Sequence, residues 1–258
     1  MKTLIIQSYR RHDVPAWIDR CLLSVRAWAA SSGHDYLLTD DSAFDLCGPD
    51  YLAKVGDNPR SKTNLCRLEL IARAHADGYD RAIWMDADIF VFAPKRLVFE
   101  PADGIVFSRE TWLWPKGEGW EIIKTLNNCV VASPSGDKDL GFIIGAIRHV
   151  AAHHPIDHNF RVGVDLIRGL HRFMHFDLTS SVGMFSNHTV VAIAHGREGL
   201  LRLQAIHHQA PVYAANLCAS DHMTPVVPER DAHQAMDILQ ATRGEVINGH
   251  LGASAAGE

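Results

Sequence analysis

An apolar segment at residues 81–92, RAIWMDADIFVF, carries two carboxylates near its middle, Asp86 and Asp88. Residues two apart on an extended chain point to the same side, so a strand here would bring both carboxylates to one face. Because burying bare carboxylates is costly, we expect the apolar run to end at a site. Two converging carboxylates suit Mg²⁺ or Mn²⁺, which substrate phosphates help to coordinate. The alternative is a strand end with two solvated aspartates.

An amphipathic helix is predicted just before this segment, from residue 61 to Gly78. Its start is expected to be capped by Ser61 or Thr63. Lys62, Asn64 and Arg67 fall near that N-terminal end, where anions bind favourably. Its apolar residues recur at helical spacing, at Leu65, Leu68, Ile71 and Ala72. The sequence therefore predicts a basic helix that leads into the acidic strand.

Short apolar runs and amphipathic helices also alternate along the rest of the chain. Strands are expected at residues 4–6, 34–41, 104–108 and after residue 128, and helices at residues 14–29, 139–152 and 229–239. This alternation indicates an α/β fold, in which ligands bind at the carboxyl ends of strands. Gln7, Ser8, Tyr9 and Arg10 follow the first strand and are expected there. Asp40 ends the second strand, where it would either receive donors from a ligand or cap the next segment.

The helix of the form SKxNxxR followed by GYDRAIWMDADIFVF resembles the donor-binding core of GT-A-fold glycosyltransferases. Residues 126–134, LNNCVVASP, are similar to the segment after the DxD strand in bacterial members related to capsular-polysaccharide and other sugar-transferase groups. Together these segments cover residues from about 1 to about 150 in the order of that family. The resemblance implies a GT-A (Rossmann-like) fold, with a mixed central sheet flanked by helices.

In that family the DxD motif holds a nucleotide-sugar diphosphate through a divalent metal. The resemblance therefore implies a UDP- or GDP-sugar donor, Mn²⁺ or Mg²⁺ as cofactor, and a saccharide or other hydroxyl acceptor. Asp88 would bind the metal directly, Asp86 would share it or hold the ribose, and Ala87 lies between them. Lys62 or Arg67 would add positive charge beside the departing diphosphate. The most similar groups mostly retain the anomeric configuration, which implies a retaining transfer.

Further candidates lie on both sides of residue 126. Asn127 and Asn128 precede a buried strand, where their amides would bind donor hydroxyls or diphosphate or simply close a turn. Residues 111–120 hold three tryptophans and two glycines. We expect a loop there that either closes over a sugar or packs on the surface. Asp165 is the candidate for contacting the acceptor hydroxyl, although its segment departs from the Gly-Pro usual in the most similar groups.

Many enzymes of the resembled family complete the metal site with a histidine or amide near the C-terminus. The candidates here are His195, His207, His208 and His222. We prefer the pair His207 and His208 as metal ligands, with Asn216 and Ser220 as substitutes.

Composition bounds the remaining choices. The chain has 258 residues, of which 47% are hydrophobic, enough for one large domain. We expect a single domain over residues 1–248, with a donor half of about 1–135, an acceptor half of about 136–248 and a disordered tail at 249–258. Thirty acidic residues outnumber 25 basic ones, which gives no overall electrostatic case for nucleic-acid binding.

Location is also predicted from the sequence. Five scattered cysteines without a CxxC pair favour a reducing compartment. No signal peptide and no apolar run of about 20 residues is apparent, so we expect a cytoplasmic enzyme without a transmembrane segment, and leave peripheral membrane contact open.

Three other functions share parts of this pattern. A haloacid-dehalogenase-type phosphatase expects Thr or Val two residues after the second Asp, where Phe90 stands here. A nucleotidyltransferase would share the fold and metal but usually has a glycine-rich basic loop after the first strand, which residues 7–12 lack. A non-catalytic nucleotide-sugar-binding module of the same fold is the third alternative.

Overall fold

The structure is a computed structural model that describes residues 1–156, 161–218 and 226–252. The candidate residues Ser220 and His222 lie outside these ranges, as does the end of the predicted tail, residues 253–258. Within the described ranges, no helix is long and apolar enough to cross a bilayer.

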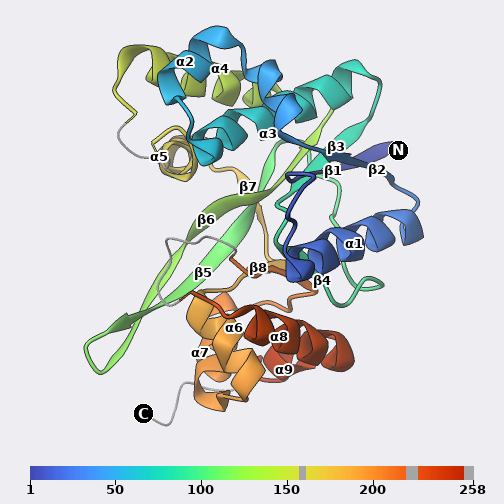
Figure 1. The fold of residues 1–258 in the computed structure, drawn as a ribbon, viewed down its shortest axis with the longest axis vertical. Helices are drawn as coiled ribbons and strands as arrows, with labels where there is room; N and C mark the ends of the chain where they lie inside the picture. The colour runs from blue at the N-terminus through green and yellow to red at the C-terminus, as the bar shows by residue number, and fades with distance from the viewer. Residues whose placement is uncertain (157–160, 219–225, 253–258) are drawn as a thin grey trace.

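Two β-sheets form the centre of the fold (Figure 1). The six-stranded sheet has the order β2 (Asp35–Thr39), β1 (Thr3–Ser8), β3 (Arg81–Met85), β6 (Gly119–Pro134), β5 (Val106–Lys116) and β7 (Asp177–Thr179). The three-stranded sheet has the order β4 (Ile89–Val91), β9 (Ala214–Asn216) and β8 (Val182–Met184). Strand β1 is parallel to β2 and β3, whereas β6 is antiparallel to β3 and β5. The predicted α/β class with a mixed central sheet is confirmed.

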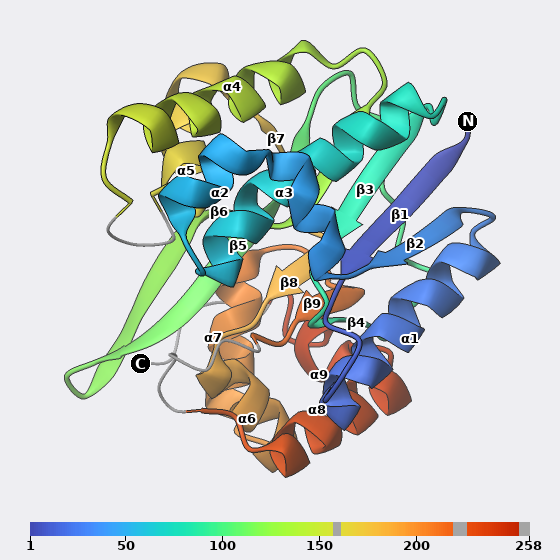
Figure 2. The same ribbon diagram turned by 45° about the horizontal axis from the view of Figure 1, so that its top comes forward.

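Helices flank both faces of the six-stranded sheet (Figure 2). They are α1 (Ala16–Ser31), the 3₁₀ helix η1 (Asp41–Cys47), α2 (Pro49–Val55), α3 (Pro59–Ala76), α4 (Lys138–His153) and α5 (Val164–Met174). The helices α6 (Asn187–His195), α7 (Glu198–His208), α8 (Glu229–Thr242) and α9 (Glu245–Asn248) gather beside the smaller sheet.

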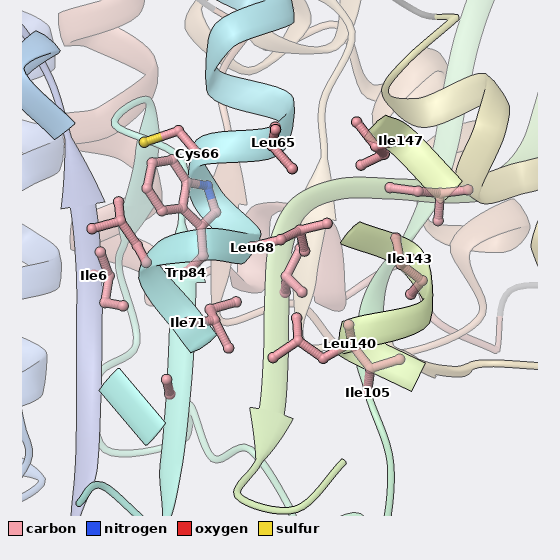
Figure 3. Close-up of a cluster of buried hydrophobic side chains, with 14 of the residues drawn as sticks. Ile6, Leu65, Cys66, Leu68, Ile71, Trp84, Ile105, Leu140, Ile143 and Ile147 are labelled. Atoms are coloured by element: carbon pink, nitrogen blue, oxygen red, sulfur yellow. The ribbon is translucent and has the colours of Figure 1, made fainter. Parts of the chain in front are cut away.

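Alternate residues of the central strands enter different hydrophobic clusters. Ile6 and Trp84 pack with residues of α3 and α4 on one face, as Figure 3 shows. Ile5 and Ile83 pack with α1 residues on the other face. Because both faces are covered, the middle of β1 (residues 4–6) and most of β3 (residues 82–85) consist of consecutive apolar residues.

The segment that was expected to be one strand is divided at the two aspartates. Strand β3 ends at Met85 in the larger sheet, and β4 begins at Ile89 in the smaller one. The backbone N–H of Ile89 donates to the carbonyl of Asp86 at 3.1 Å, which closes a turn. Asp86 and Asp88 therefore lie where the chain passes between sheets, and the prediction of a continuous extended strand is wrong.

Residues 111–120 form a β-hairpin and not the predicted loop. Strand β5 pairs with β6 continuously from Ser108 to Lys116, and Gly117 adopts a positive φ of 61° in the turn. Aromatic and β-branched residues on both strands, among them Trp112, Trp114 and Ile122, favour this pairing over an irregular loop. The hairpin extends away from the sheets in Figure 1.

Helix α3 starts earlier than the sequence analysis expected. Its cap is Asn58, whose side chain accepts hydrogen bonds from the backbone N–H groups of Arg60 and Ser61. Pro59 occupies the first helical position, where its missing N–H costs nothing. The first turn of α3 therefore carries Arg60, and neither Ser61 nor Thr63 caps it.

Candidate functional site

A cavity of about 290 Å³ opens where the two sheets meet, and we call it the DxD cavity. It is reached from the carboxyl ends of β1 and β3, the edge at which α/β folds bind ligands. The predicted site residues that line it are Ser8, Tyr9, Arg67, Asp86, Ala87, Asp88, Asn127 and Asn128. The structure thus brings together these residues from four separate segments of the chain.

Asp86 is held by two donors that come from different elements. The indole Nε1–H of Trp84 donates to Oδ1 of Asp86 at 2.7 Å, and a guanidinium nitrogen of Arg67 lies 3.3 Å from the same oxygen. Burial raises the pKa of Asp86, while Arg67 and the hydrogen bond from Trp84 oppose that rise. Only 7% of the Arg67 side chain and 27% of the Asp86 side chain are exposed, so the arginine is withdrawn from water while the carboxylate keeps an open side toward the cavity.

Arg67 is itself fixed in place. Its Nε donates to the carbonyl of Thr63 at 3.3 Å, its guanidinium lies 5.3 Å from the ring centroid of Trp84, and it donates to the carbonyl of Asn128. The guanidinium therefore links α3, β3 and β6 at the wall of the DxD cavity.

Asp88 immediately precedes β4 and is bonded to residues at the end of β9. Its Oδ1 accepts a hydrogen bond of 2.6 Å from Nδ2 of Asn216, and its carbonyl accepts one of 3.0 Å from the N–H of Leu217. The Oδ1 of Asn216 in turn accepts from the N–H of Cys218 at 2.8 Å. Asn216, which the sequence analysis proposed as a substitute metal ligand, thus lies beside Asp88 in the cavity lining.

Gln7 holds the turn that carries Asp86 without lining the DxD cavity itself. Its side chain is fully buried, donates through Nε2 to the carbonyl of Asp86 at 3.1 Å, and accepts from the Tyr36 hydroxyl at 3.0 Å. Burial raises the pKa of Tyr36 to about 12. Gln7 does not line the cavity, so its expected direct contact with a nucleotide is not supported, and it positions the DxD turn instead.

Two other predicted residues at strand ends turn away from the cavity lining. Arg10 is exposed and donates to the carbonyl of Asp13 at 3.0 Å. Asp40 caps η1 by accepting from the N–H of Ser42 at 3.0 Å, which was the alternative role considered for it. Local turn and cap bonds compete for short polar side chains at such positions.

Lys62 and Asp165 also lie outside the lining. Lys62 is 3.9 Å from a carboxylate oxygen of Asp57, on a different side of α3 from Arg67. Asp165 is exposed and 3.6 Å from Arg168, while its neighbour Val164 lines the cavity. The expected roles of Lys62 at the diphosphate and of Asp165 at the acceptor are not supported by this placement.

His207 and His208 lie at the end of α7 and do not line the DxD cavity. Nε2 of His208 donates to the carbonyl of Ser180 at 2.8 Å, which leaves Nδ1 to accept from the Thr111 hydroxyl at 3.3 Å. Both ring nitrogens are thus in use, and burial lowers the pKa of His208. The expectation that this histidine pair completes a metal site is not supported by their position.

Arg60 is a cavity residue that the sequence analysis missed, whereas Asn64 was expected near the anion-binding end of the helix. Both line the DxD cavity from α3, and the Oδ1 of Asn64 accepts from Nδ2 of Asn128 at 3.3 Å. Gly163 allows this arrangement, because a Cβ there would lie 2.2 Å from Nδ2 of Asn64. Asn58-Pro59 was the available signal, since it places Arg60 in the first turn of α3.

An irregularity in β6 brings the amides to the site. The partner of Phe107 is Val131, whereas the partner of the next residue, Ser108, is Asn127. Residues 128–130 therefore bulge out of the ladder, and bulges of this kind commonly re-aim side chains beside functional sites. The predicted Asn127 and Asn128 both line the DxD cavity as a result.

No model of a known protein family matches this chain, and no curated protein matches it by sequence. Among solved structures, it is similar to a glycosyltransferase involved in the glycosylation of the major capsid of PBCV-1. That similarity has 12% identity and a TM-score of 0.53, and it covers 92% of this chain and 100% of the other. Mouse xyloside xylosyltransferase 1 in its apo form matches with 10% identity and a TM-score of 0.46, over 87% of this chain and 99% of the other. The chain therefore has the mixed α/β, GT-A-like fold of the first of these structures.

Proposed function

We propose that this protein is a metal-dependent glycosyltransferase that moves a sugar from a UDP- or GDP-sugar to a hydroxyl acceptor, with retention of configuration. The observation that carries the proposal is the position of Asp86 and Asp88. They stand at the two ends of the turn that joins the sheets, and both line one cavity with the basic first turns of α3. The GT-A-like fold supports a nucleotide-sugar as the donor.

The donor set of the DxD cavity fits a divalent ion. Two carboxylates face the same cavity, and the described residues contain no group of three or more His, Cys, Asp and Glu side chains that would hold an ion alone. Mg²⁺ and Mn²⁺ are commonly held by one or two carboxylates together with substrate phosphates. Asp88 and Asp86 would hold the ion, and when bound it would supply Lewis-acid stabilisation of the departing diphosphate.

The N-terminal part of α3 would bind the diphosphate. The helix dipole and its first N–H groups attract anions, and Arg60 and Thr63 line the cavity at this end. Arg60 is exposed and forms no ion pair with any residue that the structure describes. Arg67 is already committed to Asp86 and Asn128, so Arg60 replaces Lys62 as the cation that we assign to the phosphates.

Residues at the end of β1 would hold the nucleoside. Tyr9 offers an aromatic face for the base, and Ser8 offers a hydroxyl beside it. Asn64 and Asn128 hydrogen-bond to one another on the same lining and would contact sugar hydroxyls.

The test is nucleotide release from a panel of UDP- and GDP-sugars, with Mn²⁺, with Mg²⁺ and with chelator. We expect metal-dependent release that falls at least ~100-fold in Asp88→Asn, because the ion that would stabilise the departing diphosphate loses a carboxylate ligand. Asp50→Asn, an exposed carboxylate on α2, is the matched control and should leave the rate unchanged.

Release that persists in chelator and in Asp88→Asn would contradict the proposal. Metal-dependent nucleotide binding without release from any donor, even when acceptors are supplied, would instead indicate a binding module of the same fold.

A further inference from the structure

A second cavity, of about 450 Å³, lies between the β5–β6 hairpin, α5 and the end of α7. We call it the basic cavity. Most of its ionisable lining residues are cations or histidines: Arg109 from β5, Lys124 from β6, Arg168, His171 and Arg172 from α5, and His207 from α7. A chain with a net charge of −5 has no general reason to gather cations in one place. This concentration of positive charge therefore indicates a ligand.

The topology brings these cations together from two sides. Arg109 pairs with Leu126 and Thr111 pairs with Lys124, so Arg109 and Lys124 lie on the same face of the hairpin, diagonally across the ladder. On α5, Arg168 and Arg172 are four residues apart and share one helix face. Side chains from a sheet and a helix thus converge on one space.

Most of this positive charge is not neutralised. Arg168 pairs with Glu110 and lies 3.6 Å from Asp165, but Arg109, Lys124 and Arg172 form no ion pair within the described part of the chain. Arg109 donates to the hydroxyl of Ser180 at 3.0 Å.

The neighbouring histidine responds to this excess charge. The pKa of His207 is lowered by burial and further by the charge of Lys124. An anion in the basic cavity would relieve that repulsion.

The basic cavity adjoins the DxD cavity along α5. Val164 lines the DxD cavity, and Arg168 and Arg172 follow it by about 6 Å and about 12 Å along the helix axis, at 1.5 Å per residue. Arg168 also binds Glu110, which is hydrogen-bonded to the side chain of Asn127 in the DxD lining. The two cavities are therefore neighbours along α5, and the contacts of Arg168 with Glu110 and of Glu110 with Asn127 link their walls.

We propose that the basic cavity binds a phosphate group carried by the acceptor, so that the acceptor class is a phosphorylated saccharide. This inference rests on the proposed function. Arg109, Arg172 and Lys124, which form no ion pair with the described residues, suit a phosphate dianion. Guanidinium forks match phosphate oxygens in pairs, and the ammonium adds a point charge. Arg168 is already paired with Glu110 and forms part of the wall of the basic cavity.

The first experiment measures binding alone, by calorimetric titration of the full chain with pyrophosphate in the presence of chelator. The double variant Lys124→Gln/Arg172→Gln should weaken binding at least about tenfold, since each lost charge-assisted hydrogen bond is worth about that factor. The matched control Lys95→Gln/Arg26→Gln removes the same charges from exposed positions that line neither cavity, and it should bind as the wild type does.

The variant Arg60→Gln separates the two cavities, because it removes a cation from the DxD lining only. Pyrophosphate binding that survives Arg60→Gln and is lost in the double variant places the anion in the basic cavity. No binding, or equal binding in the double variant, overturns the proposal. If the double variant fails to fold, Lys124→Gln alone gives the same readout from an exposed strand position.

A second titration identifies the source of the phosphate by comparing glucose 6-phosphate with orthophosphate. We expect the sugar phosphate to bind more tightly, because the cavity holds more than a phosphate ion, and we expect that advantage to vanish in the double variant. Equal affinity would mean that the cavity takes a free anion, and the assignment to an acceptor would fall. These titrations need no transferase turnover, so their result stands apart from the nucleotide-release assay.

Discussion

The two cavities differ in whether their charged side chains are already paired. In the DxD cavity, the Asp86 carboxylate is already bound by Trp84 and by the nearly buried Arg67. In the basic cavity, Lys124 and Arg172 are exposed and form no ion pair with described residues. The first arrangement fixes geometry before a ligand arrives, as preorganised catalytic sites do, whereas the second leaves its charge for a ligand to neutralise.

The largest loss of stability is expected on removal of Arg67, the buried cation of the DxD cavity. We expect Arg67→Gln to lower the free energy of unfolding by about 3–5 kcal/mol, because it leaves the carboxylate of Asp86 without its counter-charge. Urea denaturation of the wild type and the variant measures this difference.

The control is Arg73→Gln on the same helix. Arg73 lies 3.2 Å from Asp77, but 67% and 52% of the two side chains are exposed, so we expect a change within about 0.5 kcal/mol. Equal effects at the two arginines would show that the Arg67 pair behaves as a surface ion pair.

The next largest loss of stability is expected from a change in packing at the DxD cavity. In Gly163→Ala the new methyl group would overlap the Asn64 amide, which must then leave Asn128. We expect a loss of about 1–3 kcal/mol in unfolding free energy, together with weaker nucleotide binding. Gly141→Ala on α4 has open space around its Cβ position and should not destabilise the protein. A neutral Gly163→Ala would mean that the start of α5 can move without cost.

The sequence anticipated the DxD cavity far better than its surroundings. Asp86, Ala87 and Asp88 line the DxD cavity as expected. They could be picked out in the sequence because a short apolar run with internal carboxylates is a local signal. The change of sheet at Ala87 was hidden, since β3 and β4 are both buried and both read as apolar strand. The cap at Asn58 was visible in the sequence, but we placed the helix start too late.

Residues from the C-terminal half were harder to predict, because long-range pairing decides where they lie. Asn216 meets Asp88 only because β9 pairs with β4, across a sequence separation of 128 residues. Lys124 and Arg172 likewise share a cavity through the packing of α5 on β6, which no local pattern records. The histidines at 207 and 208 were chosen by residue type, and the fold uses His208 to hold α7 to β5.

The stability of the protein should depend on pH through His208, at the end of α7. Because burial lowers the pKa of His208 below its ordinary value of 6.5, the unfolded state binds more protons below that pH. Stability is therefore complete above about pH 6.5 and falls as the pH drops toward the folded-state pKa, by up to about 1.4 kcal/mol per pH unit.

Thermal unfolding between pH 7.5 and 5 should show this slope in the wild type and a smaller one in His208→Gln. His149→Gln, which replaces a histidine on α4 outside both cavity linings, should keep the wild-type slope. Identical slopes in all three proteins would mean that His208 accepts a proton in the folded state without loss.

The smallest effect expected concerns the cap of α3, which aims the helix N-terminus at the DxD cavity. Asn58→Ala removes the acceptor for the N–H groups of Arg60 and Ser61 and should cost about 1 kcal/mol. Ser186→Ala removes a comparable cap from α6, which does not line the cavity, and should cost a similar amount. Nucleotide affinity, measured by calorimetry, should weaken a few-fold in Asn58→Ala alone, because only that variant loosens the turn that carries Arg60. If the two variants bound nucleotide equally well, the first turn of α3 would not be part of the phosphate site, and the task of neutralising the diphosphate would return to Arg67.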